Sequence, residues 1–323
     1  MTTLESIREL VQTEFNSVND KITSCLNSEV DTICQIAQYI LESGGKRLRP
    51  TLVLLSGKAC NAPIEPLITL AAVIECMHTA TLLHDDVVDT SQQRRGKPAA
   101  NLVWSNPACV LVGDFLYSRC FQLLVSIDNM PMMHLLAQAT NTLAEGEVLQ
   151  LMNKHNPDIT LDQYQKVIQN KTAKLFEVAA SSGGVLAKQS HEILEGLAQY
   201  GMHLGTAFQL VDDLLDYEAD PEVLGKNIGD DLAEGKATMP LIYALHNSSP
   251  EQADQIRQAI QKGCLSNLSQ IQETIESTGA IQYTIDLAKQ QATIAKKALG
   301  VLPPSIFKDA LMDLASVSVT RKA

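Results

Sequence analysis

Aromatic residues are scarce in this chain, and so is positive charge. Phe, Trp and Tyr make up 4% of the 323 residues, and 25 Lys and Arg stand against 37 Asp and Glu, a formal net charge of −12. Proteins that hold single-stranded nucleic acid stack bases on aromatic side chains in a basic groove. Duplexes and anionic lipids attract proteins through clustered Lys and Arg. We therefore expect no nucleic-acid partner, and any anionic substrate must be held by local cations or metal.

Paired cysteines and long apolar runs are missing too. The seven cysteines are odd in number and contain no CxxC pair, which favours free thiols in a reducing cytoplasm. The first ten residues are charged and amphipathic, so we expect no signal peptide. The most apolar window, 66–83, is interrupted by Glu75 and His78, which is typical of a buried helix. We expect a cytoplasmic protein with at most transient membrane contact.

Strict two-residue alternation, the pattern of β-strands, is also absent, and apolar residues recur with the helical period instead. Clusters of Gly, Pro, Asn and Ser separate the periodic segments, for example at 61–63 and 181–184. The pattern predicts one all-α domain over 1–323, a single large bundle of about a dozen helices. The expected helices are 3–26, 28–42, 50–60, 64–89, 107–126, 131–152, 160–181, 191–217, 238–247, 250–262, 266–277, 280–299 and 304–321.

Two acidic boxes of the same form are the strongest local signal. One reads Asp-Asp-Val-Val-Asp at 85–89 and the other Asp-Asp-Leu-Leu-Asp at 212–216. Residues four apart share a helix face, so each box places its first and last carboxylates one turn apart, where like charges repel. The first box also falls at an expected helix C-terminus, where the macrodipole disfavours anions. Both boxes therefore call for a strong cation, and Mg2+ prefers a few carboxylates together with substrate phosphates.

Cations and glycines follow each box. Segment 90–106 contains Arg94-Arg95-Gly96, and segment 217–238 contains two Gly-Lys pairs, at 225–226 and 235–236. A further basic cluster, Lys-Arg-Leu-Arg, follows Gly44-Gly45. Arg binds phosphate with a bidentate fork, and Lys supplies a mobile charge. The spacing of a nucleotide P-loop is missing, so these clusters indicate two phosphorylated ligands, one held through metal and one held directly.

Several motifs together resemble those of the trans-isoprenyl diphosphate synthase family, and its bacterial long-chain members most closely. They are Gly-Gly-Lys-Arg-Leu-Arg-Pro at 44–50, His-Asp-Asp-Val-Val-Asp at 84–89, Arg-Arg-Gly at 94–96, Lys-Thr at 171–172, Phe-Gln-Leu-Val-Asp-Asp at 208–213 and Gly-Lys-Asn-Ile-Gly-Asp-Asp-Leu at 225–232. All occur in the family's order between about residues 40 and 245. The resemblance implies an all-α isoprenoid synthase fold around a central cavity and a homodimer.

By this resemblance the enzyme condenses isopentenyl diphosphate onto an allylic diphosphate such as farnesyl diphosphate. Three Mg2+ ions are implied, with the metal ligands Asp85, Asp89, Asp212 and Asp216. The remaining implied catalytic residues are Asp86, Asp213, Lys171 and Lys226. The implied isopentenyl diphosphate site is Lys46, Arg49, His78 and Arg95. The implied allylic diphosphate site is Arg94, Lys171, Thr172, Gln209, Lys226 and Lys236.

Product length is expected to depend on the helix before the first box. Ala80 and Thr81 lie five and four residues before Asp85, about one turn deeper at roughly 1.5 Å per residue. Both are small, so elongation beyond farnesyl length is expected. The resemblance to the long-chain members implies an octaprenyl chain destined for a quinone. Leu123 and Leu124 are candidates for the tunnel floor, although ordinary core leucines would look the same.

Other functions remain open at this point. A synthase of another product length, such as geranylgeranyl or nonaprenyl, would carry the same motifs. A class I terpene synthase shares the acidic chemistry but needs neither a second DDxxD nor an isopentenyl diphosphate site. A non-catalytic subunit of a heteromeric synthase would be expected to have lost aspartates, and here both boxes are whole.

Overall fold

The structure is a computed structural model, and it describes residues 3–218 and 228–320. Its helices are α1 (Leu4–Glu9), α2 (Gln12–Cys25), α3 (Asp31–Glu42), α4 (Leu48–Ala59), α5 (Ile64–Val88), α6 (Ala100–Val103), α7 (Asn106–Ser126), α8 (Met130–Asn153), α9 (Leu161–Ile168), η1 (Gln169–Ala173), α10 (Lys174–Leu186), α11 (His191–Glu218), α13 (Asp230–Ala233), α14 (Met239–Asn247), α15 (Pro250–Lys262), α16 (Leu268–Ser277), α17 (Ala280–Ala298), η2 (Leu299–Val301) and α18 (Ile306–Thr320). Two short strands, β1 (Gln93–Arg94) and β2 (Lys97–Pro98), pair as an antiparallel hairpin. The expected all-α fold is confirmed.

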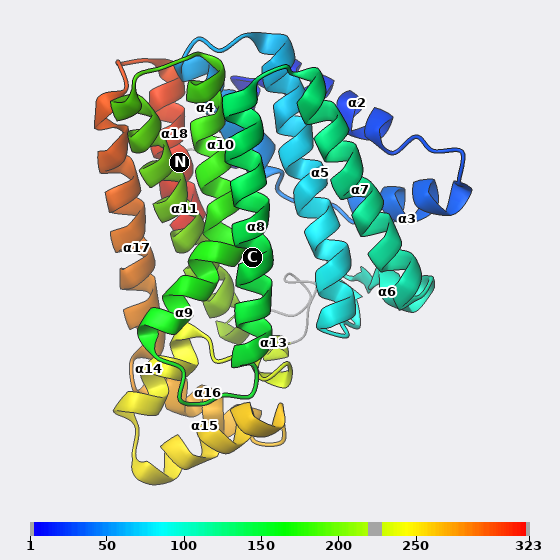
Figure 1. Cartoon of the computed structure of the whole chain (residues 1–323). Helices are drawn as coiled ribbons and strands as arrows, with labels where there is room; N and C mark the ends of the chain where they lie inside the picture. The colour runs from blue at the N-terminus through cyan, green and yellow to red at the C-terminus, as the bar shows by residue number, and fades with distance from the viewer. Residues whose placement is uncertain (1–2, 219–227, 321–323) are drawn as a thin grey trace.

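Long helices packed side by side form most of the molecule (Figure 1). The most extensive pairings join α11 to both α17 and α10, α5 to α7, and α10 to α4. The largest apolar cluster lies among α2, α4, α5, α8, α10 and α11. A smaller group, α14 to α16, lies at the lower end of Figure 1 and shares a second apolar cluster with Tyr217 and Leu232.

Local sequence sets the helix ends. Thr160 and Ser249 begin α9 and α15 with capping boxes, in which each hydroxyl accepts a bond from the third helical N–H and Gln163 or Gln252 bonds back. Asn129 caps α8 through Met132 N at 3.0 Å. These polar residues satisfy N–H groups that have no partner inside the helix.

Three sequence-based boundaries were wrong. The expected helix 3–26 is broken at Leu10–Val11, and Ile7, Val11 and Phe15 are buried on both sides of the break. The expected helix 160–181 contains the π-helical turn η1. The expected break at 181–184 is the interior of α10, because the glycines there serve close packing: a Cβ on Gly183 would lie 2.4 Å from the backbone of Gly57 on α4.

Two helices, α5 and α7, are long and apolar enough to cross a membrane by length and composition. In α5, 72% of the most apolar window is buried inside the protein, so α5 is the core helix that the sequence predicts. In α7 only 33% of that window is buried. An apolar helix with so much open surface is typical of a contact with another molecule.

Candidate active site

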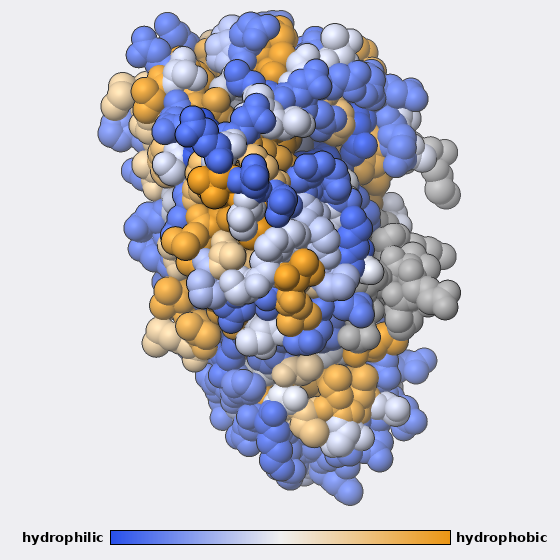
Figure 2. Space-filling view, turned by 90° about the vertical axis from the view of Figure 1, so that its right-hand side faces the viewer, coloured by the Kyte–Doolittle hydropathy of each residue, from blue (hydrophilic) through white to orange (hydrophobic). Residues whose placement is uncertain are grey.

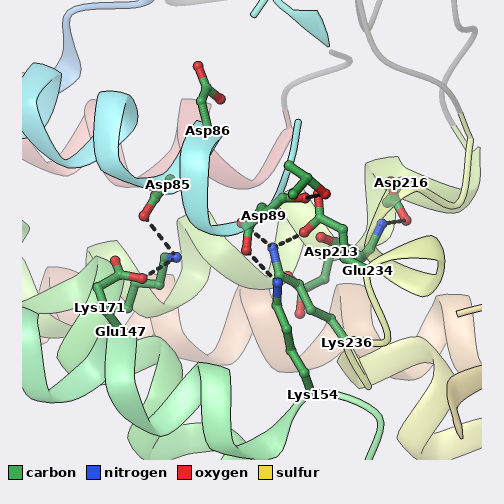
Figure 3. Close-up of polar contacts among 12 residues, drawn as sticks. Asp85, Asp86, Asp89, Glu147, Lys154, Lys171, Asp213, Asp216, Glu234 and Lys236 are labelled. Atoms are coloured by element: carbon green, nitrogen blue, oxygen red, sulfur yellow. Dashed lines mark hydrogen bonds and ion pairs between the residues drawn. The ribbon is translucent and has the colours of Figure 1, made fainter. Parts of the chain in front are cut away.

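The first acidic box lies at the end of α5, and lysines surround it. Asp89 is the C-cap of the helix, and its N–H bonds to the carbonyl of Asp85. Lys154 Nζ lies 2.7 Å from Asp89 Oδ1, and Lys236 Nζ lies 2.9 Å from Oδ2 (Figure 3). Lys171 Nζ lies 3.4 Å from Asp85 Oδ1. The crowded carboxylates that the sequence predicts are therefore matched here by ammonium groups.

The middle aspartate of this box has a different role. Asp86 is fully buried and points away from the lysines in Figure 3. Its Oδ1 accepts bonds from Arg94 Nε at 2.9 Å and from a terminal guanidinium nitrogen at 2.6 Å. Burial opposes the charged state of Arg94, but Asp86 outweighs it and the pKa of Arg94 is raised. The pair therefore anchors the hairpin that carries Arg94 and Arg95 beside the end of α5.

The second box lies near the end of α11, and its middle aspartate is also held inside. Asp213 is buried and accepts bonds from Gln209 Nε2 at 2.8 Å and Tyr164 Oη at 2.5 Å. Asp216 Oδ2 accepts from the backbone N–H of Asp231, which belongs to α13. Asp212, by contrast, is partly exposed.

The turn η1 joins the two boxes. Lys171 reaches Asp85 of the first box. The next residue, Thr172, donates from Oγ1 to Gln209 Oε1 at 2.8 Å. Gln209 in turn donates to Asp213 of the second box. The wider π-helical turn is a common feature of functional sites.

Glycines on both sides fix the position of η1. A Cβ on Gly146 of α8 would lie 2.7 Å from Lys171 N, and a Cβ on Gly205 of α11 would lie 2.6 Å from Ala173 Cα. Only glycine lets three backbones approach this closely. The Lys171–Thr172 pair is therefore held by the main chain of two neighbouring helices.

Two buried carboxyls in the site carry raised pKa values. Burial and the charge of Asp231 raise the pKa of Asp213 to about 7. Burial and the charge of Asp85 raise the pKa of Glu147 to about 7, although Glu147 Oε2 lies 2.6 Å from Lys171 Nζ. Asp89 differs, because Lys236 and Lys171 outweigh the effect of its burial and hold its pKa well below the ordinary value.

The raised pKa of Asp213 predicts a pH effect on stability. Its folded pKa of about 7 exceeds the ordinary 3.8, so the stabilisation it gives is complete below pH 3.8 and is lost as pH rises to about 7. With a chelator present to remove metal, the unfolding free energy of the wild type should therefore fall between pH 3.8 and about 7, by on the order of a few kcal/mol. The unfolding free energy of Asp213→Asn should not show this fall, because asparagine does not ionise. Urea unfolding at a series of pH values measures it. Parallel pH profiles for the two proteins would contradict this ionisation.

A basic cluster, Arg49, His78 and Arg95, lies beside the first box. The guanidinium of Arg95 covers Gly45, where a Cβ would lie 2.8 Å from its nitrogen, and Gly45 has φ +143°. The Arg49 guanidinium lies 4.5 Å from the centroid of the Phe176 ring. Burial lowers the pKa of Arg49 to about 10 against the opposing charges of Glu75 and Asp212. The basic cluster therefore lies within electrostatic reach of the second box.

His78 lies among these arginines. Burial holds the pKa of His78 well below its ordinary value, and four positive charges lower it further: those of Arg49, Arg95, Arg94 and Arg47. The imidazole is therefore neutral at pH 7 and can accept or donate a hydrogen bond. Three of the four residues that the resemblance assigns to isopentenyl diphosphate, Arg49, His78 and Arg95, thus form one basic cluster.

Other predicted residues are placed less directly. Lys226 lies outside the described residues, and Lys46 is exposed, with its carbonyl bonded to Arg8 at 2.6 Å. Thr81 is partly exposed on the helix face of Asp85. Ala80 is fully buried in a cluster with residues of α3 and α7. Their roles stay predictions.

The two leucines proposed for the tunnel floor lie on α7. Leu124 is 1% exposed within the largest apolar cluster, and Leu123 packs partly buried against the same cluster. Both positions are as compatible with ordinary core packing as with the floor of a product tunnel, so the chain-length role of these leucines also stays a prediction.

Four residues that the fold brings into the site have no role in the sequence-based predictions. They are Glu147, Lys154, Tyr164 and Glu234. Glu147 follows Gly146 in the last part of the expected helix 131–152, and this glycine was a weak indication of a functional position. Lys154 sits in a polar break between helices, and only the tertiary fold brings it to Asp89.

Within 3–218 and 228–320, no three His, Cys, Asp or Glu side chains form a group that could hold a metal ion by themselves. The acidic boxes instead offer separate carboxylates on two helices. Such an arrangement suits an ion that takes part of its coordination from a substrate phosphate.

Comparison with known proteins agrees with this geometry. The model of the polyprenyl synthetase family matches residues 30–277. The octaprenyl diphosphate synthase of Escherichia coli is 49% identical, covering 98% of this chain and 99% of that protein. The all-trans-nonaprenyl-diphosphate synthase of Rhodobacter capsulatus is 44% identical over 96% of both.

A solved structure is also similar. The polyprenyl synthase of Caulobacter crescentus, in complex with calcium and isoprenyl diphosphate, superposes with a TM-score of 0.96 at 42% identity, covering 99% of this chain and 98% of that one. Shared fold, shared length and a matching family model lead to one conclusion: the chain belongs to the polyprenyl synthetase family and is a prenyltransferase.

Proposed function

We propose that this enzyme adds isopentenyl diphosphate repeatedly to an allylic diphosphate, such as farnesyl diphosphate, and releases an all-trans octaprenyl diphosphate. One observation carries the proposal: Lys171 and Thr172 link the two acidic boxes into one site beside the basic cluster of Arg49, His78 and Arg95. The site therefore has two places for diphosphate, one next to carboxylates and one next to guanidinium groups.

Divalent metal, with Mg2+ as the proposed ion, fits the first of these places. The donors are hard carboxylate oxygens of Asp85, Asp89, Asp212 and Asp216, and lysine ammonium groups already lie on two of these residues. We expect three ions per site. Bound ions would stabilise the negative charge that develops on the leaving diphosphate. The Caulobacter protein was solved with calcium and isoprenyl diphosphate, which supports a divalent cation beside a diphosphate.

The chain's own residues would orient the reaction. Lys171, Lys236 and Arg94 would provide fixed positive charge where the carbon–oxygen bond of the allylic substrate breaks, and the motif gives Lys226 the same role. Thr172 and Gln209 offer hydrogen bonds to the same diphosphate. Arg49, Arg95, Lys46 and neutral His78 would hold isopentenyl diphosphate so that its double bond attacks the allylic carbon, and a proton is then lost. No side-chain nucleophile is required.

The octaprenyl product rests on the relatives. The synthases of Escherichia coli and Haemophilus influenzae, at 49% and 43% identity, both make octaprenyl diphosphate by name. The nonaprenyl enzyme of Rhodobacter capsulatus, at 44% identity, represents a competing specificity. We propose a quinone side chain as the destination of the product and the cytoplasm as the location of the enzyme.

Incubation of the pure chain with farnesyl diphosphate, labelled isopentenyl diphosphate and Mg2+ tests the proposal. We expect labelled polyprenyl diphosphate with octaprenyl as the main length, and no product when isopentenyl diphosphate is omitted. A cyclised hydrocarbon from farnesyl diphosphate alone would indicate a terpene synthase. No elongation by the pure chain would indicate a subunit that needs a partner.

We also propose a homodimer through α7 and α8. Large apolar side chains are exposed on α6, α7 and α8: Leu102, Val103, Val110, Leu111, Val125, Met130, Val148, Leu151 and Met152. Figure 2 looks onto the side of the molecule where α7 lies in Figure 1, and apolar patches interrupt its hydrophilic surface. Leu111 and Val125 are 67% and 65% exposed, values that favour a covered face in solution.

Leu111→Glu should therefore convert the dimer to monomer, because the charge would be buried without a partner. Light scattering at micromolar concentration should give twice the chain mass of 35.2 kDa for the wild type and about that mass for the variant. Ile306→Glu, at a residue 61% exposed on α18, is the matched control and should stay dimeric. A monomeric wild type would overturn the proposal.

A further inference from the structure

Lys154 is a nearly buried lysine that neither helix periodicity nor the motifs assign to the site. It is the C-cap of α8, its side chain is 13% exposed, and its ammonium lies 2.7 Å from Oδ1 of Asp89, which is itself 10% exposed. Lys236 occupies the other oxygen of the same carboxylate at 2.9 Å. Both oxygens of Asp89 are thus bonded to ammonium groups (Figure 3).

His155 fixes the segment that carries Lys154. Its backbone N–H donates to Gly235 O at 2.8 Å, and its φ of 62° is left-handed. Its imidazole occupies the space where a Cβ on Gly235 would lie, 2.3 Å from Nδ1, and Nδ1 lies 3.2 Å from Ile260 O. Because Gly235 precedes Lys236, this contact brings the two lysines, 82 residues apart in the chain, to Asp89 as a pair.

The two lysines create a competition at Asp89. A divalent cation that binds an oxygen of Asp89 competes with the ammonium group on that oxygen, because both cations are attracted to the same carboxylate and repel each other. The displaced ammonium stays beside the new metal ligand because His155 and Gly235 hold its backbone, so it is placed to bind a phosphate oxygen on that metal. An ammonium binds phosphate readily as a point charge.

We propose that Lys154 is a further diphosphate-binding residue, which lies on Asp89 in the free enzyme and transfers to the substrate diphosphate when metal and diphosphate bind together. Lys154 thereby weakens metal binding in the absence of diphosphate and strengthens diphosphate binding in the presence of metal. The inference rests on the proposed metal and diphosphate chemistry of this site.

Calorimetry with Lys154→Met tests the two effects separately. The first titration uses Mg2+ alone, and the second uses inorganic pyrophosphate at saturating Mg2+. We expect Mg2+ alone to bind the variant about 3-fold to 10-fold more tightly, and pyrophosphate to bind about 10-fold more weakly. Lys236 remains on Asp89, so no buried carboxylate is left unpaired and the fold should be retained.

Two further variants complete the design. Lys154→Arg keeps the charge and should restore most of the pyrophosphate affinity. Lys58→Met removes a remote lysine that pairs with Glu14, and both of its affinities should equal those of the wild type. Opposite changes in the two affinities are not expected from a purely structural role, which would move both the same way.

The outcomes separate this inference from the proposed function. If the wild type binds no pyrophosphate in Mg2+, the proposed diphosphate site is wrong. If the wild type binds it and Lys154→Met changes neither affinity, or weakens both, Lys154 has only a structural role and the inference is overturned.

Discussion

Asp85→Ala should lower the turnover of allylic diphosphate by about 10³-fold or more with the fold retained. A fixed group that stabilises developing charge is commonly worth ~10²–10³-fold, and a metal ligand contributes at least as much. The fold should survive because Lys171, which lies 3.4 Å from Asp85, keeps its 2.6 Å contact with Glu147. The variant leaves no unpaired buried lysine, the usual cause of large destabilisation.

The measurement is kcat for elongation, together with the circular dichroism and the melting temperature of the variant. Asp158→Ala is a suitable control, since this aspartate is exposed and pairs with Arg257 far from the acidic boxes in sequence. It should retain wild-type turnover. Turnover of Asp85→Ala within a few-fold of the wild type would show that the first box does not hold the metal.

Thr81→Phe should shorten the main product to between farnesyl and geranylgeranyl length. Thr81 lies one turn before Asp85 on the same face, a rise of about 6 Å at 1.5 Å per residue. A phenyl group there would block the growing chain after a few isoprene units. The Thr81 hydroxyl bonds only to His78 O of its own helix among the described contacts, at 2.7 Å, so its loss should cost little stability.

Thr81→Val is the matched control, because valine keeps the size of threonine and removes the hydroxyl. It should give the wild-type product length. Mass spectrometry of the polyprenyl products after dephosphorylation measures both variants. An unchanged long product from Thr81→Phe would place the tunnel on another face of α5.

The sequence predicted the acidic boxes and their neighbourhood well, because these features depend on short-range spacing. Asp85 and Asp89 share a face by helical period alone, and the clustered arginines follow directly in the chain. The same period distinguishes Thr81 from Ala80, because adjacent residues point to different sides of a helix. Ala80 lies on another side of α5 than Asp85 and packs in the cluster with residues of α3 and α7.

Features that depend on tertiary approach could not be predicted. The turn η1 takes its π-helical form where Gly146 and Gly205 press on it from two helices, and nothing within 169–173 itself indicates those neighbours. Lys154 is brought to Asp89 by a contact between His155 and Gly235, 80 residues apart. The glycines at 183–184 looked like a helix break because the close approach of α4 is not visible in one segment.

The most direct test of the central claim is the number of divalent ions that the site holds with diphosphate. Electron paramagnetic resonance can count bound Mn2+, as a substitute for Mg2+, in the presence of saturating inorganic pyrophosphate. If the two boxes are walls of one metal site, the wild type should bind about three ions per chain, and Asp85→Ala and Asp212→Ala should each bind fewer. An equal number of bound ions in the wild type and both variants would contradict the account.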